Sequence, residues 1–276
     1  MNPHDSQPIS FKALVRCVQK NHKLIFQMTK REVIGRYKGS VFGLAWSFFN
    51  PILMLAIYTF VFSIVFKSRW GASNADSKTE FALILFTGLI VFNLFAETIT
   101  KAPNLILGNI SYVKKVVFPL EILPIINFFA ALFHAIISFC VLLFAFILFN
   151  GFLSWTVIYL PIVLMPLAFL ILGLSWFLSS LGVFARDVGQ TIGILTTLLM
   201  FLSPVFYPVS AVPPEFQIGI MLNPLSFIIE QARSILIFGL SPDWEGLSIY
   251  TLASFLVMWL GYAWFQKTRK GFADVL

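Results

Sequence analysis

Glu230 and Arg233 carry opposite charges in an otherwise apolar segment, and their spacing places both side chains on one face of a helix. Asn223 and Pro224 predict where that helix starts, because asparagine caps the first turn and proline fits the first helical position. The two charges can therefore form an ion pair. A structural pair at a surface is the favoured interpretation, and a pair at the mouth of a pathway is the alternative.

Other constellations that carry chemistry are missing from the sequence. The nucleotide-binding pattern G-x-x-x-x-G-K-[ST] does not occur. The three histidines are too scattered for a metal site or a proton relay, and the long apolar runs contain no cluster of carboxylates. We therefore expect no catalytic residue, metal or cofactor in this chain, and no nucleotide site of its own.

The composition is that of a membrane protein. Hydrophobic residues make up 59% of the 276 positions, charged residues make up 11%, and 32 residues are phenylalanine. One soluble core cannot bury so much apolar surface. The net charge of +7 does not indicate nucleic-acid binding, because the lysines and arginines stand between the apolar runs. The sequence predicts an all-α integral membrane protein.

Six apolar runs predict six transmembrane helices. Their approximate boundaries are residues 41–66, 81–96, 122–149, 155–184, 190–207 and 247–265. Only Asn150, Gly151 and their neighbours separate the third run from the fourth, which predicts a helical hairpin. Fifteen of the 19 lysines and arginines lie on the side that six spans assign to both termini. The excess of positive charge then makes both termini cytoplasmic.

Residues 11–37 show an amphipathic helical pattern, with a break predicted at Asn21. The basic side chains near its end are Lys30, Arg31, Arg36 and Lys38. Such a helix lies on a membrane surface. The sequence therefore divides into a cytoplasmic interface segment, residues 1–40, and a six-span domain, residues 41–276.

Residues 198–229 are apolar enough for a bilayer, yet five prolines prevent one straight helix. The helix that starts at Gln190 is predicted to end near Tyr207, and two apolar pieces follow at residues 216–222 and 225–240. One interpretation is a re-entrant mouth of a pathway, where protein or water satisfies the broken backbone. The other is an external loop with a helix lying flat in the interface.

Several aromatic residues could stack on sugar rings in a conduit, although interface anchoring or packing is favoured for each single one. They are Trp46, Phe49, Tyr58, Phe201, Phe206 and Tyr207. Phe216 begins the first apolar piece after the prolines. With Glu230 and Arg233 it completes the candidate set of channel and gate residues.

Residues 36–40, Arg-Tyr-Lys-Gly-Ser, followed by Gly43, Trp46 and Pro51, resemble the sequence that leads into the first span of ABC type 2 exporter permeases of the polysaccharide family. Residues 109–124 resemble the cytoplasmic coupling segment of that family. The matches to its fifth span and its external re-entrant gate are residues 186–187, 203–208 and 223–224. The ending, residues 261–276, is most similar to permeases that export lipid-linked O-antigen.

The resemblance implies a half-transporter in the bacterial inner membrane. Two copies of this permease would form a homodimer and bind two copies of a separate ATP-binding subunit, which would hold ATP and Mg²⁺. The cargo would be a polysaccharide on an undecaprenyl diphosphate carrier, moved outward through a channel at the permease dimer interface. The basic segments would dock on the ATPase and attract anionic diphosphate or lipid headgroups. The coupling residues would be Tyr112, Val113, Lys114, Lys115 and Val116.

Other functions remain as alternatives. Capsule and teichoic acid exporters are similar to the O-antigen branch, and a small-molecule or drug exporter of the same ABC type is the nearest competitor outside it. A proton-coupled flippase is disfavoured by the scarcity of charges in the apolar runs. A membrane-embedded glycosyl or acyl transferase would need a carboxylate pair or a His–Asp arrangement, which we do not find.

Overall fold

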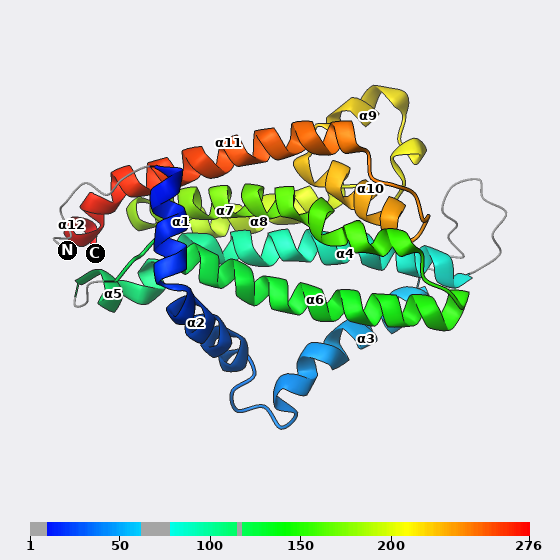
Figure 1. The fold of residues 1–276 in the computed structure, drawn as a ribbon, viewed down its shortest axis with the longest axis horizontal. Coiled ribbons are helices and arrows are strands. Elements are labelled where there is room, and N and C mark those ends of the chain that lie inside the picture. The colour runs from blue at the N-terminus through cyan, green and yellow to red at the C-terminus, as the bar shows by residue number, and fades with distance from the viewer. Residues whose placement is uncertain (1–9, 62–77, 115–117) are drawn as a thin grey trace.

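The computed structural model describes residues 10–61, 78–114 and 118–276, and every regular element in these ranges is a helix. The four longest helices are α4 (Lys78–Lys101), α6 (Ile122–Asn150), α7 (Leu160–Phe184) and α11 (Trp244–Thr268), which run along the longest axis of the molecule (Figure 1). The helices of intermediate length are α1 (Phe11–Lys20), α2 (His22–Gly35), α3 (Trp46–Tyr58), α8 (Val188–Leu202), α9 (Pro214–Met221) and α10 (Pro224–Leu236).

The remaining elements are single turns. They are α5 (Ile110–Lys114), α12 (Phe272–Val275) and the 3-10 helices η1 (Gly43–Ala45), η3 (Ala102–Asn104), η4 (Leu107–Asn109), η5 (Trp155–Tyr159), η6 (Val209–Ala211) and η7 (Arg269–Gly271). Helices α5 and α12 lie at one end of the bundle, and α9 lies at the other (Figure 1). The all-α class predicted from the sequence is confirmed.

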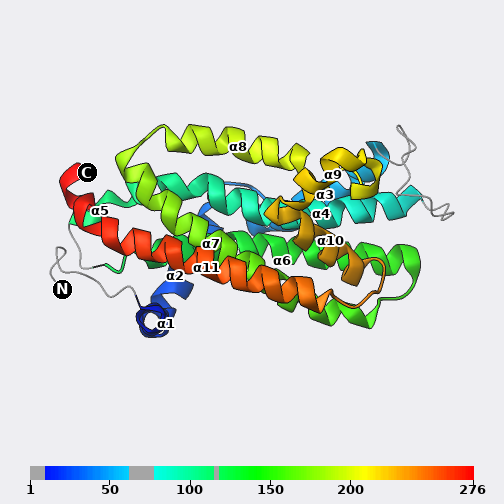
Figure 2. The same cartoon turned by 90° about the horizontal axis from the view of Figure 1, so that it is seen from above.

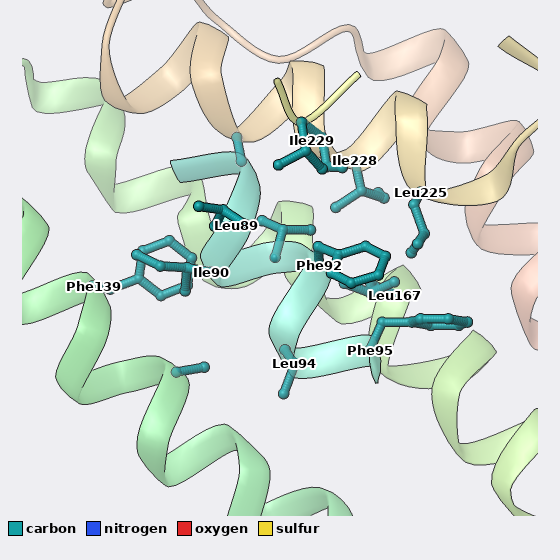
Figure 3. Packing of buried hydrophobic residues seen from close by; sticks show 14 of the residues in the cluster. Leu89, Ile90, Phe92, Leu94, Phe95, Phe139, Leu167, Leu225, Ile228 and Ile229 are labelled. Carbon is teal, nitrogen blue, oxygen red and sulfur yellow. The ribbon is translucent and has the colours of Figure 1, made fainter. Parts of the chain in front are cut away.

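Helix α4 is the centre of the bundle. In its most apolar stretch 83% of the residues are buried, whereas the corresponding share is 39% or less in the other candidate spans. A helix that is apolar all round is a buried helix, and residues 81–96 carry no charge on any face. Figure 3 shows Leu89 and Phe92 of α4 packing under Ile228 and Leu225 of α10.

Five helical segments in the described part of the chain are long and apolar enough to cross a membrane. They are Gly43–Val61, Glu80–Asn104, Ile122–Phe149, Trp155–Phe184 and Trp244–Val275. The third and fourth have the predicted boundaries, and Gly151 closes the helix before their turn with a φ of 77°. Residues 62–66 of the predicted first span lie outside the described residues.

The predicted fifth span, residues 190–207, is shorter than expected. Helix α8 ends at Leu202 and not near Tyr207, because Ser203 precedes Pro204 and takes an extended conformation, with φ −97° and ψ 148°. Its 15 residues measure about 22 Å at roughly 1.5 Å per residue, which is less than the roughly 30 Å of a hydrocarbon core. α8 nevertheless lies alongside α4 and α7 (Figure 2).

Helices α7 and α11 pack closely because two glycines face each other. A side chain at Gly173 would place its Cβ 2.6 Å from the Cα of Met258, and one at Gly261 would collide with the backbone of Gly173. Small residues at such a crossing let two helix backbones approach each other. This contact fixes the last long helix against the middle of the bundle.

The amphipathic segment is broken at Asn21, as predicted, into α1 and α2. Part of its apolar face is covered by protein: Leu14, Ile25 and Val33 are buried, and α2 packs on α6. Phe26 points away from this contact, with 71% of its surface exposed. Helices α2 and α3 diverge from the other helices and form a V in the lower part of Figure 1.

Candidate functional site

The segment with the five prolines folds as an irregular turn followed by two helices. We call residues 203–236 the broken segment. Its helix α9 lies on the outside of the bundle, and α10 packs against α4 and α7. Helix α9 covers most of the first predicted apolar piece, and α10 covers residues 225–236 of the second, which was predicted to reach residue 240. Only α10 is buried among other helices.

Arg233 of α10 is fully buried and binds three separate parts of the chain. Its Nε donates to the carbonyl oxygen of Ile84 in α4 at 3.1 Å. Its Nη1 donates to the carbonyl oxygen of Pro204 at 2.6 Å and to the carboxylate of Glu230 at 2.8 Å. Its Nη2 donates to the carbonyl oxygen of Val205 at 2.9 Å. Arg233 therefore fixes the irregular turn after α8 to the central helix.

The predicted ion pair forms, but Arg233 does not lie at a surface. Its side chain is 0% exposed, whereas that of Glu230 is 39% exposed. Gly88 of α4 provides the space, because a Cβ at this position would lie 2.7 Å from Nη2 of Arg233. The favoured surface interpretation is corrected in this respect: the pair is the outer part of a buried hydrogen-bond network.

Asn223 joins the start of the broken segment to the start of α10. Its side-chain amide donates to the hydroxyl of Ser203 at 2.8 Å and to the carbonyl oxygen of Leu202 at 3.4 Å. Its side-chain oxygen accepts from the backbone N–H of Leu225 at 3.0 Å, which caps α10 as the sequence predicts. Asn223 is 8% exposed, so these bonds form away from solvent.

Three more side chains satisfy carbonyl oxygens in or next to the broken segment. The donors and their acceptors are Tyr207 to Phe201, Ser226 to Ile220 and Gln217 to Val212, at 2.8, 2.6 and 2.8 Å. Irregular backbone at membrane depth is tolerated where protein satisfies its polar groups. These side chains therefore stabilise the irregular backbone of the broken segment.

The candidate channel aromatics fall into two groups on different elements. Trp46 and Phe49 lie at the start of α3 and form an edge-on cluster with Phe42, with ring centroids 5.7 to 6.4 Å apart. Phe201 at the end of α8 stacks on Phe206 at 6.1 Å. Tyr58 packs against the main core, and Phe216 on α9 is 66% exposed. One copy of the chain does not gather these rings around a single lumen.

The two described members of the predicted coupling set, Tyr112 and Val113, lie at the opposite end of the bundle from α9 (Figure 1). Tyr112 of α5 is half-buried, stacks on Phe118 with centroids 4.5 Å apart, and accepts a hydrogen bond from Arg31 of α2 at 3.1 Å. Val113, like Tyr112 and Phe118, packs against a hydrophobic cluster that contains Leu120 and Phe272. Lys114, Lys115 and Val116 lie outside the residues whose side chains the structure describes.

Among the basic residues of the interface segment, Arg36 has a partner that the sequence reading missed. Its Nη1 lies 2.7 Å from a carboxylate oxygen of Glu97, which also binds Lys101 at 3.1 Å. Lys30 and Lys38 are exposed. Glu97 is a charged residue directly after an apolar run, next to a predicted cytoplasmic boundary. That position could have identified Glu97 as a partner for a basic residue of the interface segment.

Comparisons with known proteins agree with the resemblance noted from the motifs. The model of the family described as ABC-2 type transporter matches residues 23–237. An O-antigen export system permease protein RfbA of Klebsiella pneumoniae is 29% identical over 256 residues, which cover 92% of this chain and 95% of the relative. The protein of the same name from Myxococcus xanthus is 26% identical over 263 residues, which cover 95% of this chain and 98% of the relative.

Proposed function

Because this chain belongs to the ABC-2 type transporter family, we propose that it is the permease of an ATP-driven exporter that moves lipid-linked polysaccharide across the bacterial inner membrane. The observation that carries this proposal is the similarity to O-antigen export permeases over nearly the whole length of both chains. The multi-pass helical bundle fits that function.

Energy for export comes from a partner in this proposal. The sequence has no G-x-x-x-x-G-K-[ST] pattern, and its apolar runs hold few ionisable residues that could carry a coupling ion. Two copies of the permease bind two copies of an ATP-binding subunit, which holds ATP and Mg²⁺. The end of the bundle with α5 and α12 faces the cytoplasm, as the distribution of lysine and arginine supports.

The chain crosses the membrane six times, with α8 as a short fifth crossing that the irregular turn after Leu202 completes. The buried hydrogen bonds of Arg233 and Asn223 support this placement, because they satisfy the backbone that leaves the helix. Helices α9 and α10 then form the re-entrant gate on the outer side. An interfacial helix that lies flat is the alternative for α9.

The cargo is an O-antigen polymer on undecaprenyl diphosphate, and a capsule or teichoic acid polymer is the second candidate. The exposed rings of Trp46, Phe49 and Phe201 provide apolar faces on which sugar rings can stack once two copies of the chain come together. Exposed basic side chains such as Lys30 and Lys38 attract the diphosphate or anionic lipid headgroups.

Co-expression with the ATP-binding subunit tests the proposal. The two proteins should purify as a stable complex that hydrolyses ATP, whereas the permease alone should show no ATPase activity. Robust nucleotide turnover by the purified permease would refute the proposal that the partner subunit alone hydrolyses ATP. Failure of the complex to form with any ATP-binding subunit of the same cell would argue against the ABC assignment of its energy source.

A further inference from the structure

Glu121 connects three helices at the end of the bundle that contains α5. Its carboxylate accepts a hydrogen bond from Arg269 at 2.6 Å, just after α11, and another from the thiol of Cys17 in α1 at 3.3 Å. Its backbone carbonyl accepts a hydrogen bond from the indole of Trp176 in α7 at 2.9 Å. Glu121 is 7% exposed, so these bonds are largely shielded from water.

Arg269 also holds the segment in front of Glu121. Its Nη2 donates to the carbonyl oxygen of Phe118 at 3.1 Å. Phe118 stacks on Tyr112 of α5, and the hydroxyl of Tyr112 accepts a hydrogen bond from Arg31. One guanidinium therefore binds the last turn before α6, and α5 rests on that turn through a ring contact.

The last residues of the sequence pack next to α5 and the turn before α6. Phe272 in α12 is fully buried, with its ring 5.5 Å from that of Phe265 and 6.0 Å from that of Phe184. Helix α12 packs against both α5 and α7. The carboxyl-terminal tail, residues 269–276, thus folds back onto α5 and is anchored by one ion pair and one buried ring.

Helix α5 needs such support because it has only five residues. An isolated helix of that length is not stable in water, since nucleation costs more than so few hydrogen bonds return. Its orientation must therefore come from tertiary contacts. The contacts described above come from Arg31 on α2, from Phe118, and from the tail.

We propose that the carboxyl-terminal tail is a clamp that holds α5 in the orientation in which the ATP-binding subunit docks, with the Glu121–Arg269 ion pair as the positioning contact. The inference rests on the proposed function. It assigns a role in subunit coupling to the carboxyl-terminal tail, which lies outside the predicted coupling segment, residues 109–124. A permease with a loosened clamp must order α5 during binding, and this ordering weakens the complex.

The test compares two neighbouring cations of the tail. Arg269→Met removes the bonds to Glu121 and Phe118, whereas Lys270→Met removes the same charge from an exposed residue. Each full-length variant is placed in lipid nanodiscs, and the dissociation constant for the separately purified ATP-binding subunit is measured together with the unfolding temperature. We expect at least about tenfold weaker binding for Arg269→Met and less than about threefold weaker binding for Lys270→Met.

A second measurement separates positioning from general stability. Amide hydrogen exchange in α5 of the free permease should become faster in Arg269→Met while exchange in α7 and α11 stays unchanged, and Arg269→Lys should show a smaller effect on both exchange and binding. If the two methionine variants weakened binding of the ATP-binding subunit equally, net charge would explain the effect and the clamp would be refuted. The clamp would also be overturned if Arg269→Met unfolded the whole bundle, or if this variant bound the ATP-binding subunit with wild-type affinity. Absence of binding by the wild-type permease would instead contradict the proposed function.

Discussion

Replacing Arg233 by methionine tests whether the broken segment depends on one buried guanidinium. The side chain is 0% exposed and donates to the carbonyl oxygens of Ile84, Pro204 and Val205. Methionine fills much of the space but donates nothing. The oxygen of Ile84 lies within α4 and can keep its helical partner, so the main loss falls on Pro204 and Val205.

The expected magnitude follows from these two oxygens. A buried carbonyl that loses its donor costs about 1 to 3 kcal/mol, so the two together cost about 2 to 6 kcal/mol in the free energy of unfolding. The Glu230 carboxylate that loses its partner adds little to this cost, because it is 39% exposed and water can solvate it. The unfolding temperature should fall by roughly 10 °C, at about 2 to 4 °C per kcal/mol for a chain of this size.

The assay is thermal unfolding of the purified permease in detergent, with Arg16→Met as the matched control. Arg16 lies on an exposed face of α1, so the same substitution there should change the unfolding temperature by less than about 2 °C. A local measurement complements the assay: a cysteine at the fully buried Val205 should react with a thiol reagent faster when Arg233 is methionine. Equal unfolding temperatures in the two methionine variants, with Val205→Cys still protected, would refute the reasoning.

Three further predictions concern the two ends of the bundle. Ile110→Glu should prevent copurification with the ATP-binding subunit without lowering the unfolding temperature, because Ile110 is 39% exposed. Tyr112→Glu should reduce copurification and also lower the unfolding temperature, since the ring of Tyr112 stacks on Phe118. Burial and the neighbouring Glu121 carboxylate raise the pKa of the Cys17 thiol to about 12. The rate at which a thiol reagent labels Cys17 in a Cys140→Ser variant should therefore rise about tenfold per pH unit from pH 7 to 10. A plateau near pH 9 would contradict the raised pKa. In a cysteine-free background, a single cysteine at Ile220, 9% exposed, should react more slowly with an impermeant thiol reagent than one at Leu222, 78% exposed. ATP-driven cycling should raise only the rate at Ile220, and equal rates in every state would favour a flat loop over a gate.

The long helices could be predicted from the sequence because their limits are set locally. Charges and polar turns mark the ends of the apolar runs, and Gly151 adopts the left-handed conformation that closes α6. Asn21 separates α1 from α2 for a similar local reason. The end of α8 was misplaced because the apolar run continues to Tyr207, whereas the backbone responds to Pro204 by leaving the helix one residue earlier.

The contacts that organise the two ends could not be predicted in the same way. Arg233 and Ile84 are 149 positions apart, and Arg269 and Glu121 are 148 positions apart. No local spacing links such residues, because the helices between them decide which side chains meet. The pair Glu230–Arg233 was identified from its spacing of three, but its burial depends on where α4 lies and on the space that Gly88 leaves.

Reconstitution tests the central proposal most directly. The permease and its ATP-binding subunit are placed in proteoliposomes that contain a polysaccharide linked to undecaprenyl diphosphate, and the polymer that crosses the bilayer is measured with and without ATP. We predict translocation that requires ATP, both subunits and the lipid-linked polymer. Translocation by the permease alone, or ATP-dependent transport of small molecules with none of the polymer, would contradict the account.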